Sequence, residues 1–89
     1  MEKRLGTALI VVKDPVQVPA INQILTLHSE IILGRQGIPL RERNTSIISI
    51  VLEGTTDQIG ALTGKLGRIR GVMVKSVLTP EISNDYERP

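Results

Sequence analysis

The sequence contains no cysteine, tryptophan or phenylalanine, and its one tyrosine, Tyr86, lies in a polar C-terminal stretch. Without cysteine the chain can form neither disulfides nor thiolate metal sites, which suits a reducing cytoplasm. Without other aromatic side chains it lacks the stacking platforms that single-strand and RNA-binding modules use to hold bases. The core must therefore be aliphatic, and we expect no direct binding to nucleic acid.

Long apolar runs and a dominant charge sign are also missing. No apolar stretch approaches the ~20 residues of a membrane span. The run Leu5–Val12 after Met1–Arg4 faintly resembles a signal peptide, but Lys13 and Asp14 follow at once and no small-residue cleavage site appears. The net charge is +2, with both signs mixed along the chain. We expect a cytoplasmic protein without a membrane segment.

The 89 residues suffice for one small domain, which buries only about 60–65% of the surface exposed by its unfolded chain. β-branched, apolar runs predict four strands, with a polar connection at 34–45 between the second and the third. Apolar residues at helical spacing predict a helix within each half of the chain. The expected strands are Leu5–Val12, Ile31–Arg35, Ser46–Leu52 and Val72–Leu78; the helical stripes are Val18, Ile21, Leu25, His28 and Ile59, Leu62, Leu66, Ile69.

Local signals mark where these elements begin and end. Asp14-Pro15 ends the first strand and offers a helix start. Thr55 fits the N-cap of the second helix, with Gln58 completing a capping box, and Gly71 ends that helix. We therefore expect residues 1–78 to form a single domain and residues 79–89 to form a polar, flexible tail.

The two halves of the chain repeat one another at a shift of 41 residues. At this shift the first helical stripe falls on the second, and Leu9 falls on Ile50. Two βαβ units in one chain give the split βαβ arrangement. The predicted fold is α+β and ferredoxin-like (ACT-like), βαββαβ, with a four-stranded antiparallel sheet and two helices on one face.

The first and third strands are apolar on both faces. Leu5, Leu9 and Val11 share one face of the first strand, opposite Ala8, Ile10 and Val12. In the third strand, Ile47 and Val51 lie opposite Ile48, Ile50 and Leu52. Helices on one side of the sheet can bury only one face. The pattern therefore predicts a homo-oligomer, a dimer or a tetramer.

Residues suited to catalysis are scarce. The single histidine, His28, falls on core-facing Ile69 in the repeat, so we interpret it as a core or helix-end residue. One histidine with scattered carboxylates makes neither a nucleophile–base pair nor a metal cluster. We predict that the protein is not an enzyme and carries no cofactor and no metal.

The connection between the second and third strands is the densest polar patch. Its three arginines, Arg35, Arg41 and Arg43, together with Gly37, form a candidate site for a carboxylate or phosphate. The alternative is a solvated hairpin in which Glu42 pairs with its neighbours.

The second helix carries three glycines, Gly60, Gly64 and Gly67, along one side. Each costs about 0.5–1 kcal/mol relative to alanine, so we predict a contact surface there. Ala20 or Ile24 of the first helix, another subunit or a ligand could occupy it.

Two segments of the chain, GRQGIPLRERNTSIISIVLEGTTDQIGALTGKLG and GVMVKSVL, carry a family resemblance. They are similar to the small ACT-like proteins known as iron-only hydrogenase system regulators, and the similarity covers residues 4–78. The resemblance implies a regulatory role and no catalytic residue. Ligand-binding ACT domains usually have a glycine in the turn after the first strand, where this chain has Asp14-Pro15.

Together these features predict a regulatory domain that senses a ligand or contacts a protein. Its expected partners are a second copy of itself and either a small anionic effector or a regulatory protein. A structural or accessory interaction protein without a small ligand is the alternative, and a nucleic-acid-binding transcriptional regulator is a weaker one.

Overall fold

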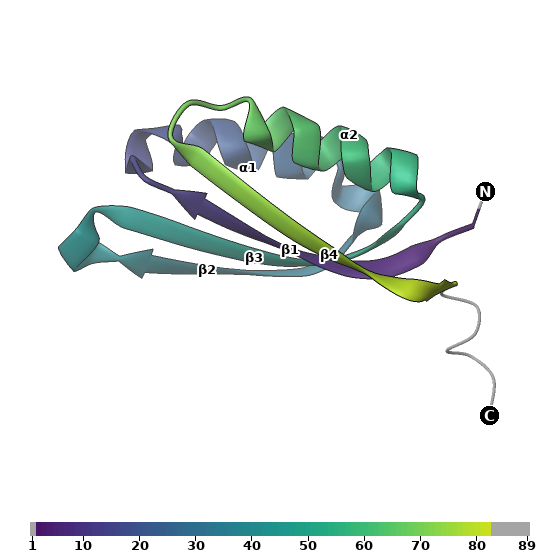
Figure 1. Ribbon diagram of the computed structural model, residues 1–89. Helices are drawn as coiled ribbons and strands as arrows, with labels where there is room; N and C mark the ends of the chain where they lie inside the picture. Colours follow the sequence, from purple (N-terminus) through teal and green to yellow (C-terminus); the bar gives the residue numbers. More distant parts are fainter. Residues whose placement is uncertain (1, 83–89) are drawn as a thin grey trace.

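A computed structural model describes residues 2–82. They form one sheet with both helices packed on the same face (Figure 1). All strand pairs are antiparallel and follow the order β2-β3-β1-β4. The predicted ferredoxin-like βαββαβ fold is confirmed. In chain order the elements are β1 (Arg4–Val12), α1 (Val18–Leu27), β2 (Ile32–Leu40), β3 (Thr45–Gly54), α2 (Thr56–Gly67) and β4 (Val72–Ile82), with short 3-10 turns at Pro15–Gln17, Ser29–Ile31 and Arg41–Arg43.

The core lies between the helices and the face of the sheet that they cover. It is aliphatic throughout, as expected from a sequence with so few aromatic residues. Burying one such side chain contributes about 1.5–3 kcal/mol. Its buried members are Ala8, Ile10, Val12, Ile21, Leu25, Ile31, Ile48, Ile50, Leu52, Ile59, Leu62, Leu66 and Val72.

Both helix starts follow the local signals in the sequence. The Asp14 carboxylate accepts a hydrogen bond from the Val16 amide, 3.1 Å away, at the 3-10 turn that leads into α1. At α2, the backbone amide of Gln58 donates to the Thr55 hydroxyl over 3.1 Å. In return, the backbone amide of Thr55 donates to the side-chain oxygen of Gln58 over 2.9 Å. The predicted capping box is confirmed. The helix ends at Gly67, four residues before the expected end at Gly71. Gly71, with φ of 79°, instead turns the chain into β4.

The expected polar connection at 34–45 is wrong, because most of it is strand β2. Gly34, Gly37 and Pro39 have low strand propensity, but pairing with β3 overrides it. An edge strand tolerates proline, which has no amide hydrogen to donate. The register shifts between Ile32 and Gly34, and Asn44, in the left-handed region at φ 50°, ends the turn into β3.

Strand β4 continues to Ile82, past the expected end at Leu78. Arg4 pairs with Ile82 in the sheet, and its guanidinium donates to the carbonyls of Thr79 and Pro80. The Thr79 hydroxyl donates to the Leu5 carbonyl over 3.1 Å. These contacts keep the polar segment after Leu78 in the sheet. The rest of the expected tail, 83–89, lies outside the described residues.

The internal repeat aligns buried residues of the two helices correctly. For the strands that precede the helices, the same alignment is one residue out of register. At a shift of 41, Ile21 of α1 falls on Leu62 of α2, and both are buried. The same shift places Leu9, which is 44% exposed, on the fully buried Ile50. Side chains alternate between the two faces of a strand, so one residue of error exchanges the faces.

Candidate functional site

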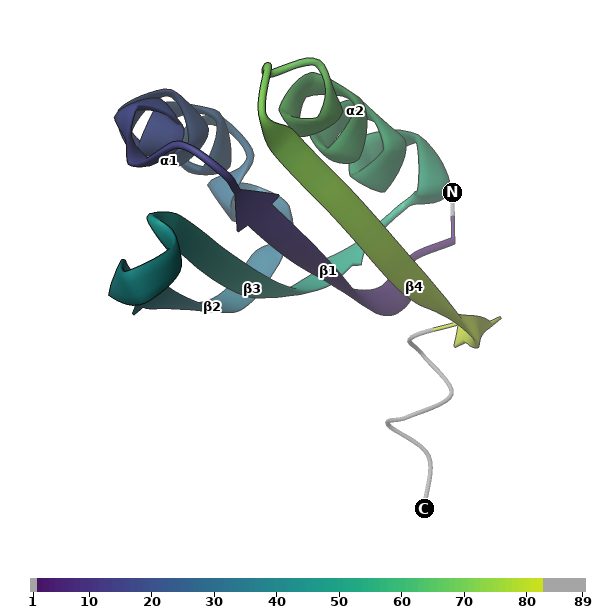
Figure 2. The same ribbon diagram turned by 60° about the vertical axis from the view of Figure 1, so that its left-hand side comes forward.

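Figure 2 shows both helices on one side of the sheet, so the opposite side is open. This open face carries many aliphatic side chains. Both helices lie on the other side, so no described helix covers this open face. The predicted sorting of β1 and β3 is confirmed, with Ala8, Ile10, Val12, Ile48, Ile50 and Leu52 in the core. The most exposed apolar side chains of the open face are Leu9 (44%), Ile38 (44%), Val51 (47%), Met73 (53%) and Val77 (68%).

One line of residues crosses the open face from edge to edge. Ile38 pairs with Ile47, Ile47 with Val11, and Val11 with Met73. These four residues, which we term the apolar row, form one band across all four strands. Paired residues have Cβ atoms only about 4.5–5.5 Å apart, so the band is continuous.

The neighbouring line on the same face is more polar. It consists of Gln36, Ser49, Leu9 and Lys75, which also pair in register. Glu53, opposite Leu5 on β3, places an acid on this face as well. The open face therefore carries one acidic and one basic side chain among the strand residues from Arg4 to Pro80.

The structure divides the predicted arginine site. Arg35 lies on the helix side of β2, where its guanidinium donates to the Asn22 side-chain oxygen of α1 over 2.5 Å. With Gly37 and Pro39, these two residues line a hollow of about 210 Å³ between α1 and the β2 edge. Asn22 was not foreseen, because nothing local connects a helix residue to a strand 13 positions later.

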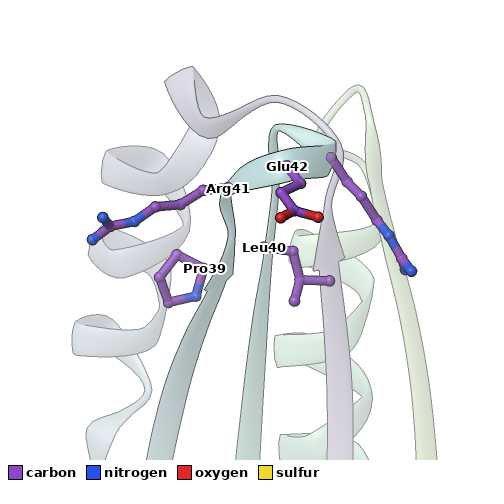
Figure 3. A pocket seen from close by; sticks show the side chains of 5 residues that line it. Pro39, Leu40, Arg41 and Glu42 are labelled. Carbon is purple, nitrogen blue, oxygen red and sulfur yellow. The ribbon is translucent and has the colours of Figure 1, made fainter.

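Arg41 and Arg43 lie farther along, on the 3-10 turn that joins β2 to β3. With Leu40 and Glu42 they line a hollow of about 430 Å³. Figure 3 shows the Arg41 side chain extending away from the Glu42 carboxylate. Within the described residues neither guanidinium has a carboxylate partner. The pairing of Glu42 with its neighbours, which the alternative of a solvated hairpin predicted, does not form.

Arg35 and the two turn arginines thus border different hollows. Pro39 lines both of them. Arg41 lies six positions after Arg35 along extended chain, a span of roughly 20 Å at 3.3 Å per residue. The four predicted ligand-binding residues form two neighbouring groups, and their role in binding remains a prediction.

The three glycines of α2 lie on its exposed flank beside β4. Gly60, Gly64 and Gly67 line a hollow of about 510 Å³ together with Thr63 and the start of β4 at 72–76. A Cβ built at any of the three meets no other atom within 4 Å. The first helix therefore does not occupy this flank, and Ala20 and Ile24 are excluded as its neighbours. Contact with another molecule remains a prediction.

His28 lies at the C-terminal end of α1, as a helix-end residue. Its Nε2 is 3.1 Å from the Lys65 Nζ of α2. Burial, and then the Lys65 charge, lower the pKa of His28, while Glu30 raises it by less. Among the side chains of residues 2–80 no group of three or more histidine or acidic side chains could hold a metal ion. None of the helices in this part of the chain is long and apolar enough to span a bilayer.

Comparison with solved structures places this fold among known proteins. Uncharacterized protein TM1266 from Thermotoga maritima is 49% identical over 86% of this chain and 98% of its own, with a TM-score of 0.82. The C-terminal domain of the MgtC protein from Mycobacterium tuberculosis is 10% identical over 89% and 90%, with a TM-score of 0.67. None of the curated proteins matches this sequence.

A nitrogen regulatory PII-like protein, CPII from Thiomonas intermedia K12, also shares the fold. Its form bound to ADP, AMP and bicarbonate is 11% identical over 89% of this chain and 99% of its own, with a TM-score of 0.51. At that identity the likeness concerns the fold alone. The sequence model of the TM1266-like family, described as iron-only hydrogenase system regulators, matches residues 4–76. Because this match spans most of the chain, the protein belongs to the TM1266-like family of iron-only hydrogenase system regulators.

Proposed function

We propose that this protein is a non-enzymatic, cytoplasmic regulatory domain that works as a homo-oligomer and binds a small anionic effector or a protein partner. The open face carries the proposal. Leu9, Val51 and Met73 are each about half exposed there, and apolar surface of this extent on a soluble domain marks an interaction site. The family supports a regulatory role.

The turn between β2 and β3 supports an anionic effector. Arg41 and Arg43 flank one hollow without a carboxylate partner in the described chain. A guanidinium can bind a carboxylate or phosphate through two parallel hydrogen bonds. The PII-like protein from Thiomonas intermedia offers a precedent, because it has this fold and binds ADP, AMP and bicarbonate.

A thermal-shift screen tests the effector. A ligand that binds only the folded state must raise the melting temperature. The probes are ADP, AMP, bicarbonate, inorganic phosphate, the amino acids and divalent metal ions. We expect an anion to raise the melting temperature of the wild type, and a variant with Arg35, Arg41 and Arg43 replaced by glutamine to lose the shift.

The control replaces Arg68 and Arg70, two exposed arginines just after α2, by glutamine. This control should keep the shift, since it lowers the net charge without touching either hollow. An equal loss in both variants would indicate nonspecific charge effects. No shift with any probe would favour the alternative, an accessory interaction protein that uses its open face and has no small ligand.

A further inference from the structure

We infer that the occupant of the open face is the open face of a second copy of this chain, with the apolar row inside the contact. The inference rests on the homo-oligomer in the proposed function and specifies its surface. It follows from the size of the face, its charge and its chemistry.

The size of the face approaches that of a standard dimer interface. Strands of nine residues, such as β1 and β2, extend about 30 Å, and four strands span about 19 Å. The projected area is therefore roughly 570 Å², and the accessible area is larger because side chains stand out from the sheet. A standard interface buries about 800 Å² on each partner. A single peptide or one helix would cover only part of this face.

Its charge is compatible with self-association. A twofold contact brings a patch onto an identical patch, so a patch of one sign would repel itself. The open face carries Glu53 and Lys75, one of each sign. A membrane surface or a nucleic acid would instead favour several basic side chains.

The chemistry of the apolar row suits packing between two sheets. Facing sheets lie about 10 Å apart, with the side chains of their inner faces interdigitated. Val, Ile and Met side chains fill such a layer and leave no polar atom unpaired. The polar members of the next line, Gln36, Ser49 and Lys75, can then border the contact or pair across it.

Analytical ultracentrifugation over a wide range of concentration tests the inference. The test variant carries Ile38→Glu and Met73→Glu, at the two ends of the apolar row. These side chains are 44% and 53% exposed, so we expect the isolated fold to keep a charge there in contact with water. The control carries Val16→Glu and Leu27→Glu, which remove apolar side chains of even higher exposure from the helix layer. We expect the wild type and the control to be oligomeric, and the test variant to associate at least about a hundredfold more weakly.

Cross-linking identifies the surface directly, because the natural chain has no cysteine. Ser49→Cys places one thiol in the middle of the open face, and Gln23→Cys places one on the exposed side of α1. A flexible bis-maleimide should join two Ser49→Cys chains efficiently and two Gln23→Cys chains poorly. Circular dichroism checks that each variant is folded.

The possible failures are distinguishable. A wild type that stays monomeric would overturn both this inference and the homo-oligomer proposed above. An oligomer that survives Ile38→Glu and Met73→Glu, or that does not cross-link through Ser49→Cys, would overturn the inference alone, because association would then use another surface.

Discussion

Gly6 on β1 shows how closely two strands pack at one residue. A Cβ at this position would lie 2.8 Å from the Val77 carbonyl oxygen and still nearer to the Leu78 side chain. Backbone cannot move aside as a flexible side chain can. We expect Gly6→Ala to lower the free energy of unfolding by about 1–3 kcal/mol, measured by urea denaturation.

The control is Gly34→Ala on the exposed part of β2, where a new Cβ meets nothing within 4 Å. It should leave stability unchanged or slightly raised, since alanine restricts the unfolded chain more than glycine does. Equal stability of the two variants would show that β1 and β4 are farther apart than described.

The titration of His28 is a second test at the residue scale. Burial, followed by the Lys65 charge, lowers the pKa of His28 below its ordinary value, which is about 6.5. The unfolded state therefore takes up the proton first as pH falls. The contribution of neutral His28 to the free energy of unfolding is therefore complete above about pH 6.5 and is lost as the pH drops through the folded pKa.

NMR can follow this titration without assignment, because the chain has one imidazole. We expect a midpoint below about 6.5, and Lys65→Gln should move it upward by removing the second cause. His28→Gln should remove this part of the pH dependence of stability. A midpoint above the ordinary value would mean that Glu30 outweighs both burial and Lys65.

At the scale of elements, the exposed side of α2 that carries Gly60, Gly64 and Gly67 allows a test of the predicted contact surface. The described chain leaves Gly64 open, so Gly64→Ala should raise the free energy of unfolding by about 0.5–1 kcal/mol through helix propensity. Thermal and urea unfolding of this variant and of Gly60→Ala measure the effect. A loss of stability or of assembly would instead support the predicted contact surface.

For the whole molecule, self-association has a thermodynamic signature. If folding is linked to association, the melting temperature rises with protein concentration. We expect this rise for the wild type, measured by calorimetry over a hundredfold range of concentration. Val51→Lys on the open face should flatten the dependence, whereas Gln23→Lys on α1 should not. A melting temperature independent of concentration would contradict the homo-oligomer.

Much of this architecture follows from local pattern. The spacing of Ile21 and Leu25 is enough to predict α1 and its buried side, and Thr55 with Gln58 predicts the start of α2, because these signals act within one helical turn. Alternation along β1 and β3 sorts their faces correctly, since side chains of a strand point to opposite sides by geometry.

The sequence predicted which arginines belong to the candidate anion site, but it did not predict how they lie relative to one another. Arg35, Arg41 and Arg43 are close in sequence, but an extended strand moves Arg35 away to the hollow beside Asn22. The contribution of β4 to the open face, through Met73 and Val77, was missed although its period of two is visible in the sequence. The second residue of the Arg35–Asn22 pair comes from another element, and no local signal identifies it.

Local sequence signals are enough to predict the aliphatic core, the two helices, their N-terminal starts and the excess of apolar strand residues, because each depends on neighbours within a few positions. Contacts in the folded chain extend β2 beyond Arg35 to Leu40, extend β4 to Ile82 and hold the two arginine groups apart. These features depend on hydrogen bonds and contacts between segments far apart in the chain. Such pairing can override local propensity, and it also placed the apolar row across four strands.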